Sequence, residues 1–340
     1  MALRTLFADP MLRMLVAAVL LAALLPARGE ARDTAQLVAN AAVFLLFLLN
    51  GLRIARRDVL AGLANWRFLL PLILFVFGAM ALLGLGLNAL SEPLLPPAIA
   101  LGFLYLGALP STVQSATSYA SLGGGNLALS VVSAALLNIV GVFVTVPVFL
   151  LLGGSGQGAV GSAVIAKILL LLVLPFVIGQ ALQTAAHSFT ARYRHNIVWV
   201  DRMAIAIAVY VAFSGAVEQG IWTRVAPQAW AALLGLVAVM LLLAHGGAWL
   251  TGGMLGLPRA DRVSFLFAGA QKSAAVGAPL ATILFAPEAA GFIVVPLLLY
   301  HLIQLVVAAP LASRLAQHPA GDGDCTAPTT TATDRSAPPR

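Results

Sequence analysis

Residues 269–279, GAQKSAAVGAP, decide the fold because they place polar side chains between two strongly hydrophobic segments. Gln271, Lys272 and Ser273 stand together, and Lys272 is one of only two lysines in the chain. The glycines and the proline that flank these residues weaken a continuous helix. The stretch therefore predicts an interruption inside an apolar element.

A second stretch of the same character occupies residues 107–126, GALPSTVQSATSYASLGGGN. Hydroxyl and amide side chains follow Pro110 closely, and the segment VQSA within this stretch resembles AQKSA in the first one. The sequence thus predicts two matched interruptions. The candidate binding residues in the second stretch are Gln114, Ser115 and Ser118.

The composition is that of a membrane protein. Hydrophobic residues make up 61% of the chain and charged residues only 9%, whereas soluble domains carry about 25% charged residues. The net charge of +7 does not indicate nucleic-acid binding, because the arginines occur in short clusters between apolar runs. A single cysteine, Cys325, excludes a disulfide framework and a cysteine metal site. No CxxC, HExxH, GxSxG or phosphate-binding loop motif is present, so the sequence does not predict an enzyme.

Ten segments are long and apolar enough to cross a membrane, which takes about 20 residues each. The first also fits a secretory signal peptide, but the many similar segments that follow favour a transmembrane helix. Residues 317–340 are rich in Pro, Thr and Asp and predict a disordered tail. The ten predicted spans lie near residues 11–28, 34–52, 67–90, 96–121, 125–152, 161–187, 201–219, 227–256, 262–285 and 288–316.

The distribution of arginine predicts the orientation, because basic residues concentrate on the cytoplasmic side of membrane proteins. With the N-terminus inside, the outer loops hold Arg28, Arg32 and Arg224. The inner loops and ends hold Arg4, Arg13, Arg53, Arg56, Arg57, Arg67, Arg192, Arg194, Arg202, Arg259, Arg262 and Arg314. This bias predicts a multi-pass protein of the cell's inner (plasma) membrane with both termini in the cytoplasm.

Ten spans can divide into two sets of five, about residues 10–152 and 161–316. A set with an odd number of spans, repeated in tandem, enters the membrane in the opposite sense the second time, which is the inverted-repeat plan of many secondary transporters. The basic clusters at 52–57 and 192–196 are expected to be the long inner connections of the two repeats. We therefore expect one transporter domain over residues 1–316, followed by the tail.

The two interruptions have a physical use in such a plan. Backbone polar groups inside a membrane must all be paired, so an unwound segment is tolerated only where it is buried in protein or lines a cavity. Its helix ends then attract anions, and its carbonyl groups can hold a cation. The alternative is that small polar residues merely let helices pack closely.

The chain resembles the bile acid:sodium symporter superfamily, and more narrowly a bacterial branch related to the vertebrate orphan member of the bile-acid transporters. The segments that carry the resemblance are LPSTVQSATSYASLGGGNLALSVVSAALLNIVGVFVTVP (109–147), VLPFVIGQAL (173–182), YVAFSGAVEQGIW (210–222), FAGAQKSAAVGAPLATILF (267–285) and VPLLLYHLIQLVVAAPLASRLA (295–316). The resemblance implies an all-α membrane fold of ten transmembrane helices, with a panel domain (helices 1, 2, 6 and 7) and a core domain (helices 3–5 and 8–10). It implies that helices 4 and 9 are broken and cross, and that the cargo is an organic anion driven by Na⁺.

One departure from the family pattern concerns sodium. Sodium-coupled members carry a glutamate where this chain has Phe267, and a neutral residue where it has Lys272. Ser130 is close to the serine of the family's first sodium site, and Gln271 matches the glutamine of helix 9. The only ion that the resemblance implies is therefore Na⁺ near Ser130 and Gln271, and Phe267 and Lys272 argue against it.

Three hypotheses account for Lys272, since burying a charge in a membrane costs at least about 3 kcal/mol and calls for a functional reason. Its ammonium group replaces Na⁺ as a fixed cation, or it exchanges a proton during transport, or it pairs with an anionic substrate. The remaining alternative is that it reaches the inner membrane surface.

Further polar residues of helices 5 and 10 complete the candidate site. His301 and Gln304 share a helix face with Tyr300, at a spacing of three to four residues. Asn138 needs a partner inside helix 5, and this partner is either another helix or a solute. The full set of candidate binding residues is Gln114, Ser115, Ser118, Ser130, Ser133, Asn138, Gln271, Lys272, Ser273, His301 and Gln304.

The sequence thus favours a secondary transporter of a small organic anion that works by alternating access and is coupled to Na⁺ or to protons. The alternative is a membrane regulatory or receptor-like protein that keeps the fold without net transport. The expected partners are a small solute and the lipid bilayer, with no nucleic acid and no cofactor besides the ion. An intramembrane enzyme is disfavoured because the spans contain no set of nucleophile, base and acid.

Overall fold

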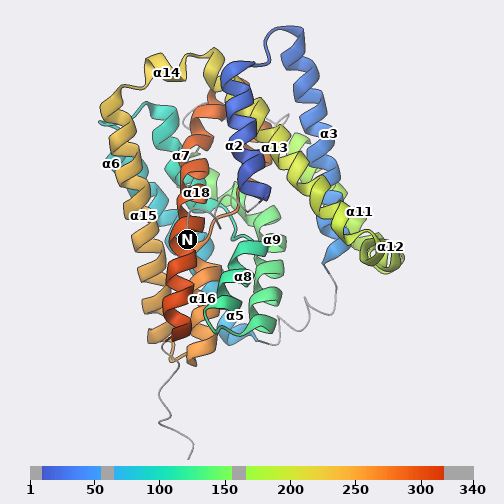
Figure 1. Cartoon of the computed structure of the whole chain (residues 1–340), viewed down its shortest axis with the longest axis vertical. Helices are drawn as coiled ribbons and strands as arrows, with labels where there is room; N and C mark the ends of the chain where they lie inside the picture. The colour runs from blue at the N-terminus through green and yellow to red at the C-terminus, as the bar shows by residue number, and fades with distance from the viewer. Residues whose placement is uncertain (1–9, 55–64, 155–165, 318–340) are drawn as a thin grey trace, which may run out of the picture.

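The computed structural model describes residues 10–54, 65–154 and 166–317, and every regular element within them is a helix (Figure 1). The predicted tail lies outside the described residues except for Gln317, which ends the last helix. The α-helices are α2 (Pro10–Leu24), α3 (Glu30–Arg53), α5 (Trp66–Leu74), α6 (Met80–Ser91), α7 (Pro97–Ala108), α8 (Gln114–Leu122), α9 (Leu127–Phe149), α11 (Leu174–Leu182), α12 (His187–Arg192), α13 (Arg194–Glu218), α14 (Ile221–Arg224), α15 (Pro227–Met254), α16 (Arg259–Ala270), α17 (Ala274–Leu284) and α18 (Pro287–Gln317). The π-helical segments are η1 (Phe75–Ala79), η2 (Leu150–Gly154) and η3 (Leu169–Val173).

The helices have the length and composition of membrane-spanning elements. Within the described residues, six of them are long and apolar enough to cross a bilayer, and three further apolar helices are shorter. The prediction of an all-helical integral membrane protein is therefore confirmed. The six long helices are Glu30–Arg53, Trp66–Ser91, Leu127–Gly153, Arg194–Glu218, Pro227–Met254 and Pro287–Gln317, and the shorter ones are Pro10–Leu24, Pro97–Ala108 and Ala166–Leu182.

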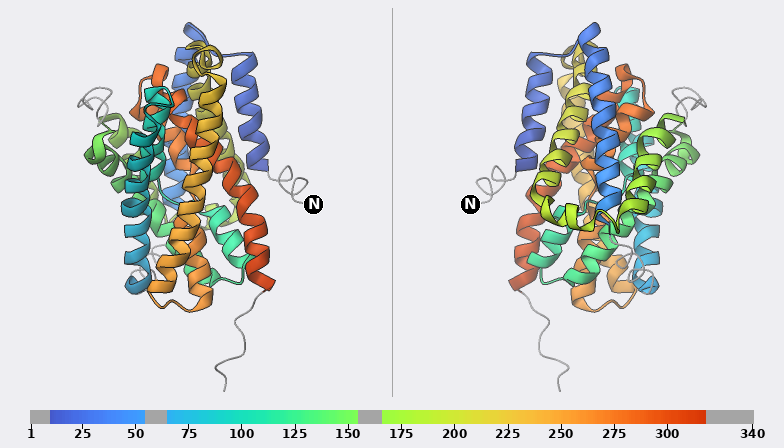
Figure 2. Two further views of the ribbon diagram at one scale, coloured as in Figure 1. Left: turned by 90° about the vertical axis from the view of Figure 1, so that its left-hand side faces the viewer. Right: turned by 90° about the vertical axis from the view of Figure 1, so that its right-hand side faces the viewer.

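The helices form two groups, which lie beside each other in Figure 1 and one in front of the other in the two views of Figure 2. α2, α3, α11 and α13 pack on one another, and we call them the first group. The second group comprises α5–α9 and α15–α18, which also pack mainly among themselves. α13 makes the main contacts between the groups, against α17 and α18.

Two helices of the second group are broken, as the sequence predicts. α7 ends at Ala108 and α8 begins at Gln114, while α16 ends at Ala270 and α17 begins at Ala274. Leu109 and Gln271 close their helices in extended conformations. The two breaks touch, because the backbone N–H of Ser273 donates to the carbonyl of Pro110 at 3.0 Å.

The basic cluster at 192–196, which was expected to be the long inner connection of the second repeat, is mostly helical. Only Tyr193 separates α12 from α13, which begins at Arg194, seven residues before the predicted span. Arginine is a good helix former, and its long side chain keeps the guanidinium at the surface while the backbone stays helical. In the other basic cluster, α3 ends at Arg53, and most of the cluster lies outside the described residues.

Candidate functional site

The side chain of Lys272 ends at the centre of the contact between the two breaks and is fully buried. Its ammonium group donates to three backbone carbonyls: Val76 at 3.0 Å, Gly107 at 2.8 Å and Leu109 at 2.7 Å. An ammonium has three hydrogens, so these oxygens use all of them. In this conformation no hydrogen of Lys272 remains for a substrate, and the side chain does not extend to the membrane surface.

The local backbone explains why these carbonyls accept from Lys272. The last carbonyls of a helix have no partner within it, and Gly107 and Leu109 stand at the end of α7. Val76 lies in η1, where the helix widens to a π-helical turn, a feature frequent at functional sites. The C-terminal end of α7 also carries the negative end of the helix dipole, which favours a cation.

The backbone of Lys272 is held from α18. Its N–H donates to the side-chain oxygen of Gln304 at 2.9 Å, and the Gln304 amide nitrogen donates back to its carbonyl at 3.0 Å. That nitrogen also lies 2.9 Å from Nδ1 of His301. The hydroxyl of Tyr300 donates to the carbonyl of Ala270 at 2.6 Å. The predicted polar face of this helix therefore does meet the break.

Gln271 connects the two breaks through its side chain, which is fully buried. Its oxygen accepts from the hydroxyl of Thr112 at 2.8 Å and from the hydroxyl of Ser115. Its amide nitrogen has no hydrogen-bond partner among the described residues, and neither has the buried hydroxyl of Ser111. A buried polar group without a partner costs about 1–3 kcal/mol, so these two atoms are candidate ligand contacts.

Other candidate residues take structural positions around the first break. The amide of Asn138 donates to the carbonyl of Ser111 at 3.1 Å and so attaches α9 to the break. Ser273 accepts from the N–H of Val276 at 3.3 Å and caps α17. Gln114 and Ser118 are exposed on α8, and they do not join the buried cluster.

Ser130 and Ser133 lie apart from the crossing. The hydroxyl of Ser130 donates to Ser264 at 2.8 Å, and that of Ser133 donates to the carbonyl of Ser130 at 3.2 Å. Ser264 stands two turns before Gln271 on α16, which is about 10 Å along a helix axis. The structure does not bring Ser130 and Gln271 together, and a sodium site between them stays a prediction.

Three contributors to the crossing did not stand out in the sequence. Val76 lies in the apolar run FVFGA, where a carbonyl that accepts from a side chain leaves no sequence signal. Thr112 belongs to the polar stretch but was not singled out among its neighbours. Tyr105, inside an apolar helix, donates a hydrogen bond from its hydroxyl to the carbonyl of Gly277 at 2.6 Å. The sequence feature that could have indicated this bond is a single hydroxyl group in a run of aliphatic residues.

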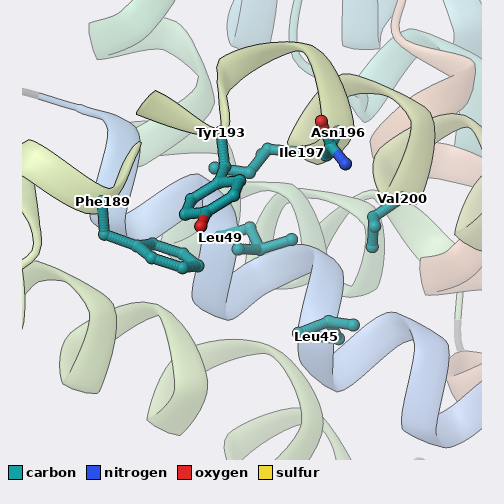
Figure 3. A pocket seen from close by; sticks show the side chains of 7 residues that line it. All are labelled: Leu45, Leu49, Phe189, Tyr193, Asn196, Ile197 and Val200. Atoms are coloured by element: carbon teal, nitrogen blue, oxygen red, sulfur yellow. The ribbon is translucent and has the colours of Figure 1, made fainter. Parts of the chain in front are cut away.

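A groove of about 360 Å³ lies elsewhere, where α12 and the start of α13 meet α3 (Figure 3). Leucines of α3 face the rings of Phe189 and Tyr193, whose centroids are 4.9 Å apart. Its other lining residues are Asn196, Ile197 and Val200 of α13. Because its lining is almost entirely aliphatic and aromatic and it is remote from the crossing, it does not serve as the candidate site.

Known proteins resemble the chain over most of its length. A sequence model of the SBF-like CPA transporter family matches residues 9–317. The chain is 40% identical over 307 residues to the uncharacterized protein PA2026 of Pseudomonas aeruginosa, covering 89% of this chain and 91% of that protein. It is 37% identical over 311 residues to the putative symporter YfeH of Escherichia coli, covering 90% and 92% of the two chains. It is 25% identical over 288 residues to the sodium/bile acid cotransporter 7 of Mus musculus, covering 82% and 83%.

Proposed function

The chain belongs to the SBF-like CPA transporter family, and from this membership we propose that it is a secondary active transporter of a small organic anion. The membership confirms the resemblance to the bile acid:sodium symporter superfamily and identifies a transporter rather than an enzyme. Sodium and bile acid appear in the name of the mouse relative. For this chain the solute is proposed only as a class.

The observation that carries the proposal is the amide nitrogen of Gln271. It is a hydrogen-bond donor, fully buried between two helix breaks, and the described residues offer it no acceptor. Its orientation is fixed because Thr112 and Ser115 hold the oxygen of the same amide. A carboxylate or sulfonate oxygen would accept a hydrogen bond from this amide nitrogen. The dipole at the nearby N-terminal end of α8 would also favour an anion.

Alternating access is proposed to move the second group of helices against the first. The contact between the groups at the predicted outer end includes an ion pair from Arg32 of α3 to Glu288 of α18, at 2.8 Å. Arg32 also pairs with Glu218 of α13 at 3.0 Å, which lies in its own group. Opening this end would break the first pair and keep the second, while solute would enter and leave past the crossing.

The finer architecture belongs to the same proposal. The two groups would be the panel and the core, and the breaks would occupy the fourth and ninth of ten spans in two inverted repeats. The first repeat would span about residues 10–152 and the second about residues 161–316. The arginine bias supports an inner-membrane protein with both termini in the cytoplasm.

Uptake into proteoliposomes tests the proposal. Purified protein would be reconstituted and supplied with a panel of small radiolabelled carboxylates and sulfonates, in sodium-containing and sodium-free buffers. We expect saturable flux of at least one anion. Gln271→Leu should reduce this flux roughly tenfold or more, because a hydrogen bond to a charged group contributes about 1.5–3 kcal/mol.

The control is Gln183→Leu, which changes a buried glutamine just after α11, far from the crossing. It should leave flux nearly unchanged. If folded wild-type protein moves none of the anions, the proposal is overturned in favour of a non-transporting regulatory protein. If flux is present but insensitive to Gln271→Leu, the assigned donor is wrong.

A further inference from the structure

We propose that Lys272 is a tethered cation that permanently fills a cation-binding cage of main-chain oxygens, and that removing its side chain opens a site for a free monovalent cation or a small alkylammonium. This inference deepens the proposed function, because it states that transport needs no free cation at the crossing. Its test measures binding and requires no transport.

The cage consists only of neutral backbone oxygens from separate segments. Val76 supplies one from η1, Gly107 one from the end of α7, and Leu109 one from the break itself. All three oxygens lie between 2.7 and 3.0 Å from the nitrogen, within the range for good hydrogen bonds. Unwound carbonyls and the C-terminal ends of half-helices are the groups with which transporters hold monovalent cations.

The charge of Lys272 has no other partner that the structure describes. A salt bridge to Lys272 would need a carboxylate within 4 Å of its ammonium. Every ion pair between described residues involves an arginine instead. Phe267, one helical turn before Gln271, is fully buried, lies with its ring 6.0 Å from that of Tyr119 and offers no carboxylate. The oriented carbonyl dipoles are therefore the main stabilisation of the ammonium.

The backbone of Lys272 is held in place as well as its ammonium group. Gln304 binds both the N–H and the carbonyl of Lys272, so the backbone cannot shift without breaking two buried hydrogen bonds. A covalently attached cation of this kind stays in the protein through every transport cycle. It supplies the charge at the crossing and carries no ion gradient, so the flux should be independent of sodium.

The first experiment titrates purified Lys272→Ala with n-propylammonium chloride and follows the melting temperature. The substitution removes three methylene groups and the ammonium, which are the atoms that n-propylammonium returns. We expect a saturable rise of roughly 2–4 °C or more. n-Propanol, which lacks the charge, and choline chloride at matched ionic strength should give no such rise.

Two further variants serve as controls. Lys272→Met keeps most of the side-chain volume without the charge, so it should not respond to n-propylammonium. Lys167, the chain's other lysine, is exposed, and Lys167→Ala should behave as the wild type in every titration. NaCl and KCl titrations of Lys272→Ala would show whether the emptied cage also takes a free metal cation.

Two results would overturn the proposal. One is a folded Lys272→Ala protein that responds to neither n-propylammonium nor a monovalent metal ion. The other is a saturable, sodium-specific stabilisation of the wild type that Lys272→Met retains, because sodium would then bind elsewhere and the lysine would not replace it.

Poor folding of the alanine variant does not block the test. Expression with n-propylammonium in the medium should then restore purified protein, while Lys272→Met should fall well below the wild type in melting temperature. Absence of both effects counts against the cage. Failure of anion uptake together with successful rescue would refute the transport function and leave the tethered cation standing.

Discussion

The contact between the two groups of helices depends on glycine, and Gly291→Ala tests whether this contact is one state of a moving protein. Gly291 of α18 faces α13 so closely that an added Cβ would lie 2.2 Å from the carbonyl oxygen of Ala212. It would also lie 2.5 Å from the Cβ of Ala216. Backbone on one side and a β-carbon on the other cannot yield by a side-chain rotation, so the helices must separate.

The required separation sets the magnitude. Ordinary contact begins at 3.4 Å, so the carbonyl of Ala212 must retreat by about 1.2 Å (3.4 minus 2.2) from the new Cβ. Overpacking of this kind costs about 1–3 kcal/mol. If the contact is present in one conformation and absent in the other, the full cost falls on the closed one. The ratio of open to closed protein should then rise roughly 5–150-fold.

Labelling of a reporter cysteine measures that ratio. Ser214, a buried residue of α13 between Ala212 and Ala216 in sequence, would be changed to cysteine after Cys325 has been replaced by serine. A membrane-impermeant maleimide should label the reporter about five times faster, or more, in Gly291→Ala than in its parent. Gly246→Ala is the matched control, because an added Cβ there meets nothing within 4 Å. Equal labelling rates in the two alanine variants, with both proteins folded, would refute the reasoning.

Three further predictions concern bonds around the two groups and the crossing. Glu288→Gln should lower the free energy of unfolding by about 1 kcal/mol or less, because its pair with Arg32 is partly exposed, yet it should speed the same maleimide labelling; unchanged labelling would remove this ion pair from the closure. Gln304→Leu should lower the melting temperature strongly, since it leaves the N–H of Lys272 unpaired, at roughly 1–3 kcal/mol, and leaves its carbonyl with only the 3.4 Å contact to Nδ1 of His301; a near-neutral result in thermal unfolding would show that the backbone finds other partners. Tyr300→Phe should have a smaller effect in the same assay, since it removes one bond to the end of α16, and an effect larger than that of Gln304→Leu would contradict the ranking.

The helix breaks could be predicted from the sequence because polar residues inside apolar runs are costly unless they are used. Gln271 and Lys272 stood out for that reason, and the break begins at Gln271. The proline of residues 269–279 contributes less to the interruption than its position suggested. Pro279 lies inside α17, so the interruption rests on the polar residues and their bonds to the first break.

What the sequence could not indicate was which oxygens the ammonium would meet. Backbone carbonyls are present at every position, and their availability depends on where α7 ends and where η1 widens. Neither the end of α7 nor the π-helical turn of η1 is marked in the sequence as clearly as a charged residue inside an apolar run. The sequence also could not show that Ser130 and Gln271 lie apart, because both are polar and both fit a family pattern. In the structure Ser130 bonds to Ser264, and Ser264 stands two helical turns before Gln271.

The lysine and the breaks each solve a problem that the other creates. An interrupted α7 leaves carbonyls without partners in an apolar surrounding, and a buried ammonium needs oriented dipoles. Together they satisfy each other through three bonds at 2.7–3.0 Å. A continuous α7 would take the carbonyls of Gly107 and Leu109 away from the ammonium, and removal of Lys272 from the interrupted helix would take away the partner of these two oxygens. This mutual dependence explains how the described residues can hold a buried ammonium without an ion pair: main-chain oxygens stabilise the positive charge at the crossing.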